Sequence, residues 1–167
     1  MMCRKVMISA ALVALLVLLA SCGKSPEAAS LPMGFDYARV AGPLDSLNSA
    51  DRKTVEDTVA LMKRGDHRLA LVRLAALNDR NPSNASLRLL SSYALLQLGN
   101  LAESLAEAQR SHNAADHGVY QCYVLAHVAT INGNKELARR EIEHVNGAGD
   151  AAMKADMKVL SRKVETN

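Results

Sequence analysis

The sequence predicts an all-α fold built from repeated pairs of helices. Gly65, Gly99 and Gly133 recur at an interval of 34 residues, and each is followed by Asp or Asn. Glycine suits the left-handed backbone conformation that ends many helices, so each glycine marks a bend between two helices. Five residues after each glycine stands a small side chain. After the first bend, apolar residues follow helical spacing, as in an amphipathic helix. The small residues are Ala70, Ser104 and Ala138, and the apolar ones are Leu69, Leu71, Leu74 and Leu77.

The interval divides the chain into three repeats, at residues 51–84, 85–118 and 119–152. Each glycine then occupies repeat position 15, and Pro82 stands close to the end of the first repeat. This pattern resembles the tetratricopeptide repeat (TPR) family, in which each repeat is a hairpin of two helices. The resemblance implies a helical-hairpin solenoid of three repeats. The sequence departs from the family pattern at position 4, where the usual large aromatic residue is missing, and the second repeat lacks its proline.

Residues 1–21 read as a targeting segment, with two basic residues followed by an apolar run over residues 6–20. That run is shorter than the roughly 20 residues with which a helix spans a bilayer. It ends in Leu19-Ala20-Ser21-Cys22, which resembles the bacterial lipobox and implies cleavage before Cys22 and a covalent lipid on its thiol. An ordinary cleaved signal and an uncleaved anchor are the alternatives. Gly23 after the cysteine resembles lipoproteins of the outer membrane, which would place the chain there, facing the periplasm.

Residues 22–50 are expected to form the lipidated cysteine and a flexible linker. Three prolines interrupt this stretch, and Ser, Gly and Ala are common in it. Phe35 and Tyr37 either dock on the folded body or remain in a disordered tether.

A further helix is expected at about residues 150–165, within a folded domain of residues 51–167. Asn146-Gly147-Ala148-Gly149 interrupts the preceding helix, and apolar residues then form one stripe. A last repeat has an uncovered apolar face, so this segment resembles the capping helix that closes a TPR array. The stripe consists of Met153, Met157, Leu160 and Val164.

The first helix of each repeat lines the concave face in TPR proteins, which implies a binding surface for a partner. Three of the four tyrosines fall on this face, and tyrosine is enriched at protein interfaces. The alternative is that some of these residues only pack against neighbouring helices. The candidate partner-binding residues are Arg52, Lys63, Leu89, Tyr93, Leu96, Gln97, Tyr120, Tyr123 and His127; other positions of the same face are Val55, Val59, Met62, Ser86, Thr130 and Ile131.

Charge and motifs argue against several other classes of protein. The chain has 20 basic and 17 acidic residues, too balanced for a typical nucleic-acid surface. No catalytic motif is recognisable, and no cofactor is expected beyond the lipid on Cys22. His112, Asp116 and His117 suggest a metal site, but they fall at a predicted turn and are interpreted as solvated.

The sequence therefore predicts a non-catalytic scaffold that binds a protein or peptide in the cell envelope. Such lipoproteins act in the assembly of pili, secretins or outer-membrane proteins, and the motifs do not separate these roles. A self-associating structural lipoprotein is the main alternative. A metal-binding or enzymatic protein is the less favoured one.

Overall fold

The computed structural model describes residues 34–41, 44 and 46–166, and these are helical without a strand. The predicted all-α class is thereby confirmed. The predicted signal peptide at residues 1–21, the predicted lipidation site Cys22 and the first part of the expected linker lie outside the described residues. No helix within the described part of the chain is both long and apolar enough to cross a membrane.

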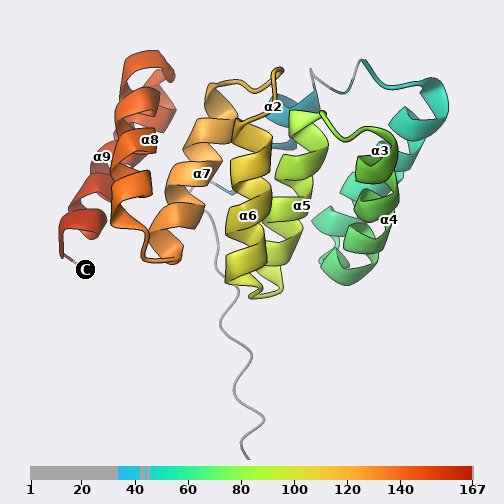
Figure 1. The fold of residues 1–167 in the computed structure, drawn as a ribbon, viewed down its shortest axis with the longest axis horizontal. Coiled ribbons are helices and arrows are strands. Elements are labelled where there is room, and N and C mark those ends of the chain that lie inside the picture. Colours follow the sequence, from blue (N-terminus) through green and yellow to red (C-terminus); the bar gives the residue numbers. More distant parts are fainter. Residues whose placement is uncertain (1–33, 42–43, 45, 167) are drawn as a thin grey trace, which may run out of the picture.

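Seven of the described helices follow one another across the molecule in chain order, and the short helix α2 lies behind them, close to α5 (Figure 1). Each of the seven packs against the next one in the chain, and α9 also packs against α7. The helices are α2 (Tyr37–Ala41), α3 (Ser49–Lys63), α4 (His67–Arg80), α5 (Ala85–Gln97), α6 (Leu101–His112), α7 (Val119–Ile131), α8 (Lys135–Ala148) and α9 (Ala151–Thr166).

The three glycines stand at matching bends, after α3, α5 and α7, along the lower edge of Figure 1. Their φ angles are +86° at Gly65, +76° at Gly99 and +73° at Gly133. One hydrogen bond also recurs at each bend, from the backbone N–H of the residue after the glycine to the carbonyl five residues earlier. These bonds are Asp66 to Leu61 (3.0 Å), Asn100 to Leu95 (3.0 Å) and Asn134 to Ala129 (2.9 Å). The repeated bond satisfies a carbonyl that the end of a helix leaves without an intrahelical partner.

Small side chains fill the contacts between the paired helices. Ala70, Ser104 and Ala138 are all fully buried. Ser92 and Ser104 cross-link α5 and α6, because each hydroxyl donates a hydrogen bond to the other residue's carbonyl, at 2.9 and 2.8 Å. Larger side chains at these positions would hold the two helices apart.

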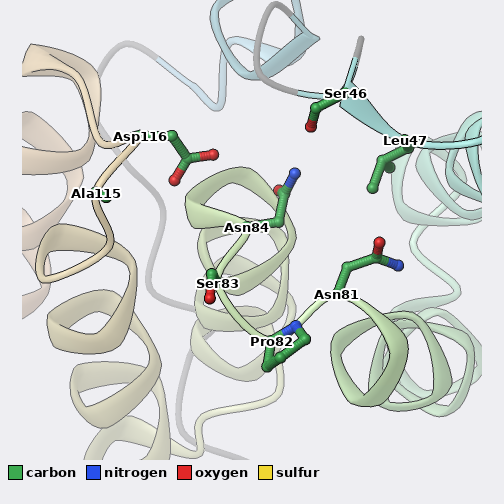
Figure 2. A pocket seen from close by; sticks show the side chains of 8 residues that line it. All are labelled: Ser46, Leu47, Asn81, Pro82, Ser83, Asn84, Ala115 and Asp116. Carbon is green, nitrogen blue, oxygen red and sulfur yellow. The ribbon is translucent and has the colours of Figure 1, made fainter.

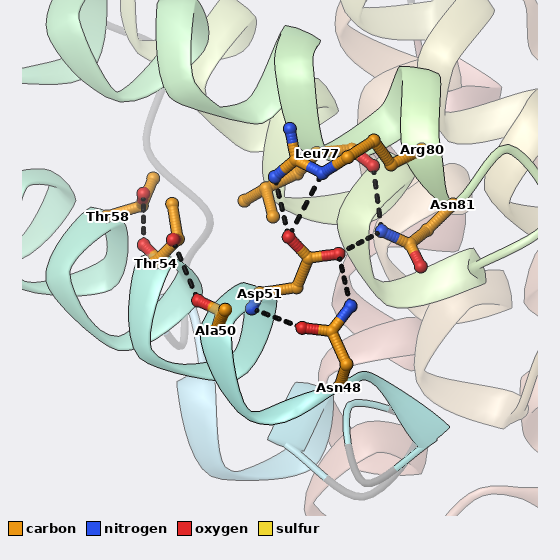
Figure 3. A network of polar contacts seen from close by, with 8 residues as sticks. All are labelled: Asn48, Ala50, Asp51, Thr54, Thr58, Leu77, Arg80 and Asn81. Carbon is orange, nitrogen blue, oxygen red and sulfur yellow. Dashed lines mark hydrogen bonds and ion pairs between the residues drawn. The ribbon is translucent and has the colours of Figure 1, made fainter.

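A polar network joins the beginning of α3 to the end of α4 (Figure 3). Asp51 accepts hydrogen bonds from the guanidinium of Arg80 at 2.6 and 3.1 Å, and from Asn81 and Asn48 at 2.9 and 3.1 Å. These partners, the Arg80 guanidinium first, hold the pKa of the Asp51 carboxyl below its usual range. Pro82 follows in the turn between α4 and α5, where it has no helical hydrogen bond to lose.

The last helix, α9, covers α7 and α8 with its apolar stripe. Asp150 accepts a hydrogen bond from the N–H of Met153 at 2.9 Å, which begins the helix. The four residues of the stripe are all buried: Met153, Met157, Leu160 and Val164.

Candidate functional site

A row of aromatic rings runs across α5 and α7 and includes a ring from the N-terminal segment. Phe35 stacks on Tyr93 of α5, with ring centroids 4.3 Å apart and planes 21° apart. On its other side Phe35 meets Tyr120 of α7 edge-on at 5.9 Å, and Tyr120 stacks on Tyr123 at 5.6 Å. We call Phe35, Tyr93, Tyr120 and Tyr123 the aromatic row. Its continuous contacts show that Phe35 docks on the folded body, one of the two outcomes left open by the sequence.

Polar contacts fix the same N-terminal segment in place. The backbone N–H of Asp36 donates a hydrogen bond of 2.7 Å to the hydroxyl of Tyr120. Arg39 forms an ion pair with Asp150 at 2.6 Å, just before α9, and its guanidinium lies 5.8 Å from the centre of the Tyr120 ring. The segment thus binds α7 and α9 through side chains and backbone together, in the way that a peptide ligand would.

One carboxylate joins the far end of the row to α9. Asp156 accepts a hydrogen bond from the Tyr123 hydroxyl at 2.8 Å, and it lies 2.6 Å from His127 Nε2. His127 follows Tyr123 by one turn of α7, and the rings meet edge-on at 4.8 Å. Burial lowers the pKa of His127, although the Asp156 carboxylate opposes this shift. At neutral pH the imidazole is therefore neutral, and in the tautomer with its hydrogen on Nε2 it donates a hydrogen bond to the Asp156 carboxylate.

Burial keeps the phenols of the aromatic row and the neighbouring Cys122 thiol protonated. Burial raises the pKa of Tyr120 to about 12 and also raises the pKa of Tyr93 and Tyr123. Burial likewise raises the pKa of the Cys122 thiol to about 11. At neutral pH the phenols remain hydrogen-bond donors, and the thiol lacks the lowered pKa of a nucleophilic cysteine.

The structure brings some of the predicted partner-binding residues together and separates others. Lys63 lies against the N-terminal segment, since its ammonium is 5.2 Å from the centre of the Tyr37 ring. Leu89 and Leu96 are fully buried between helices, and Arg52 is exposed in the first turn of α3. Gln97 is half-buried at the end of α5.

The predicted face is covered along the N-terminal part of α7 and is more open near the C-terminal ends of α3, α5 and α7. Tyr120, Tyr123 and His127 are buried, under the N-terminal segment and α9. The more accessible positions of the face gather towards the C-terminal ends of α3, α5 and α7. They are Val59, Lys63, Tyr93, Gln97, Thr130 and Ile131, all half-buried except for the exposed Lys63. We call these six residues the open half of the face.

A separate pocket of about 340 Å³ lies between loops at the opposite edge from the glycine bends (Figure 2). Asp116, which the sequence grouped with His112 and His117, lines this pocket and accepts a hydrogen bond from the N–H of Ala85 at 3.0 Å. Asp116 is thus engaged with the start of α5. The other lining residues are Ser46, Leu47, Asn81, Pro82, Ser83, Asn84 and Ala115.

Two contacts of the site had no clear signal in the sequence. The role of Asp156 depends on α9 folding back over α7. The place of Phe35 depends on the N-terminal segment returning to α7, where Asp36 bonds Tyr120, 84 residues further along the chain. Comparison of the sequence with models of known protein families finds no match, and comparison with curated proteins finds none either.

Proposed function

We propose that the protein is a lipid-anchored, non-catalytic interaction scaffold that binds a protein partner through the open half of the face. The observation that carries this proposal is that Tyr93, half-buried in the open half, already stacks on a ring of the chain's own N-terminal segment, Phe35, as it would on a partner's side chain. Aromatic side chains offer large contact areas with a polar tip and dominate many interfaces.

A TPR-like solenoid of three repeats with a capping helix is the architecture that we infer for this scaffold. Three bends with positive φ at the same 34-residue interval support it, as do the matching hydrogen bonds at each bend. The buried small residues Ala70, Ser104 and Ala138 support it too, because they permit close helix pairs. A stack of this kind presents the first helix of each pair on one side.

The lipobox-like sequence supports anchoring through a lipid on Cys22. The chain would then sit on the outer membrane and face the periplasm, with residues 23–33 between the anchor and the docked segment. Within that compartment we propose a role in envelope assembly, in which the scaffold holds a component of a pilus, a secretin or an outer-membrane protein.

Recovery of a partner from crosslinked cells tests this proposal. We expect Lys63→Ala with Tyr93→Ala to weaken capture of an envelope protein by about tenfold, since loss of an interface tyrosine commonly costs 1–2 kcal/mol. Leu69→Ala with Val72→Ala is the matched control, because both side chains lie exposed on α4, at 48% and 67%.

Equal recovery by the two double variants would contradict the proposal. Light scattering on the purified protein measures its oligomeric state and so distinguishes self-association from binding of another protein. A stable oligomer that the Lys63→Ala, Tyr93→Ala variant abolishes, without any captured envelope protein, would favour self-association instead.

A further inference from the structure

Four side chains from three helices converge at a point away from the aromatic row. His112 ends α6, Cys122 lies in the first turns of α7, and Glu141 and His144 lie one turn apart on α8. One potential ligand atom from each of them falls within 4.8 Å of all the others. Among the described residues this is the group of potential ligands that the fold assembles, and the proposed function does not use it.

Glu141 is the unusual member of the group, because it is a carboxylate with only 1% of its surface exposed. Its Oε1 accepts a hydrogen bond from Arg140 at 3.0 Å. Its Oε2 is buried and receives no well-aligned hydrogen bond, although His112 Nε2 lies 3.2 Å away. A buried carboxylate oxygen without a hydrogen bond is costly, so a cation at this position would satisfy it.

The distances fit the edges of a tetrahedral metal site. Zinc bonds of about 2.0–2.1 Å to N or O and 2.3 Å to S place neighbouring ligand atoms roughly 3.3–3.6 Å apart. His112 Nε2 and Glu141 Oε2 are 3.2 Å apart, and Cys122 Sγ and His144 Nδ1 are 3.5 Å apart. Two edges of the tetrahedron are thus already formed, and a modest contraction of the other spacings would complete it.

We propose that His112, Cys122, Glu141 and His144 form a binding site for Zn²⁺ or a divalent transition metal of similar preference. When the ion binds, the Cys122 thiol releases its proton to solvent and becomes a thiolate ligand. One thiolate, two imidazoles and one carboxylate are ligands that zinc takes, whereas Mg²⁺ and Ca²⁺ prefer oxygen alone. The hydrogen bond from Arg140 to the far oxygen of Glu141 orients the carboxylate, as outer contacts of metal ligands commonly do.

The position of the group indicates how an ion enters and what it does. His144 is exposed and His112 is partly exposed, at 21% of its side chain, whereas Cys122 and Glu141 are buried. The ion reaches the two buried ligands past the two imidazoles. Once bound, it joins the end of α6 to α7 and α8, and so stiffens the scaffold in its second half.

This group differs from the one that the sequence suggested, and it departs from the expectation of no metal site. His117 stacks near His112, with ring centroids 4.9 Å apart, but its Nδ1 lies 2.8 Å from the carbonyl of Ala114. His117 therefore offers a matched control, as a histidine beside the group that is not one of its four members. The sequence signal that was missed is the spacing of Glu141 and His144, three residues apart on one helix face.

Metal binding to the purified full chain in detergent tests the proposal directly. Zn²⁺ is titrated calorimetrically against a competing chelator, and Co²⁺ is titrated by absorption spectroscopy. We expect one ion per chain and a thiolate-to-cobalt charge-transfer band with the visible bands of tetrahedral Co²⁺. Zn²⁺ should also raise the melting temperature, because it binds the folded state preferentially.

Ligand variants separate this site from a chance one. Cys122→Ser should remove the charge-transfer band, and Glu141→Gln and His144→Ala should each weaken Zn²⁺ binding by at least about 100-fold. His117→Gln should bind as the wild type does. Since His144 is exposed, His144→Ala tests the site even if a buried substitution prevents folding, which circular dichroism would reveal. The proposal is wrong if Zn²⁺ does not bind stoichiometrically, or if His144→Ala binds it as tightly as wild type.

Discussion

At the scale of single residues, Asp156 shows how a partly buried charge is accommodated. Its carboxylate serves both Tyr123 and His127, so two polar groups of α7 share one acceptor from α9. Buried polar groups of this kind stabilise a fold only while their hydrogen bonds are made. The protonation state of His127 therefore bears on the stability of the whole protein.

His127 predicts a loss of stability in mild acid. Because burial lowers its pKa, the folded state binds fewer protons than the unfolded state, whose histidines titrate near pH 6.5. The free energy of unfolding should thus fall as the pH drops below about 6.5 and continue to fall until the lower pKa of the folded state is passed. His67, whose pKa burial also lowers, adds to this effect.

Urea unfolding at pH 7.5 and pH 5 measures the effect of His127. The wild-type protein should lose more stability between these two values than the His127→Gln variant. An equal loss in wild type and His127→Gln would show that His127 is not held neutral by the fold.

At the scale of the elements, the repeated bend is the feature that sets the helix pairs. Its geometry recurs at three positions with nearly the same φ angles and hydrogen bonds. The residue after each glycine is Asp or Asn, a type that commonly caps the next helix with its side chain. Only Asn134 does so, by accepting from the N–H of Leu137 at 3.2 Å; Asp66 and Asn100 make no such bond. The bends therefore depend mainly on their backbone bonds and on glycine.

Two glycine substitutions of opposite effect test this dependence. An added Cβ would meet no atom within 4 Å at Gly133 or at Gly147, so neither substitution introduces a clash with neighbouring atoms. Gly133→Ala should lower the free energy of unfolding by about 1–2 kcal/mol, because alanine is strained at positive φ. Gly147→Ala, within α8, should raise it by about 0.5–1 kcal/mol. Denaturant unfolding measures both, and a destabilised Gly147→Ala or an unchanged Gly133→Ala would contradict the argument.

At the scale of the whole molecule, the two ends of the described chain cover part of the face that the sequence predicted for partner binding. Phe35 and Arg39 pack on α5, α7 and the start of α9, and α9 closes α7 and α8. What is left open lies near the glycine bends. In the proposed function, the N-terminal segment that carries Phe35 would also join the lipid anchor to the open half of the face.

The helical class was predictable because its signals are local, such as glycine at a bend and apolar residues one turn apart. The covering of the face was not, since it joins residues far apart in the sequence. Tyr123 and Asp156 are separated by 33 residues, and Asp36 and Tyr120 by 84. For the same reason Tyr120 and His127, expected on an open face, are buried.

Anchoring predicts a specific loss when Cys22 is replaced. Cys22→Ala should abolish incorporation of labelled fatty acid and move the chain from the membrane fraction to the soluble one, because each buried CH₂ of an acyl chain contributes about 0.8 kcal/mol. Cys3→Ala, within the predicted signal peptide, is the control and should change neither. Retention of Cys22→Ala at the membrane would point to the uncleaved anchor instead.

Position-specific photocrosslinking in cells directly tests whether a partner binds through the open half of the face. A photoreactive amino acid replaces Tyr93, which is half-buried in the row, or Val72, which is 67% exposed on α4. We expect a discrete adduct with an envelope protein from position 93 and none from position 72. Adducts from position 72 alone, or with equal yield from both, would contradict it.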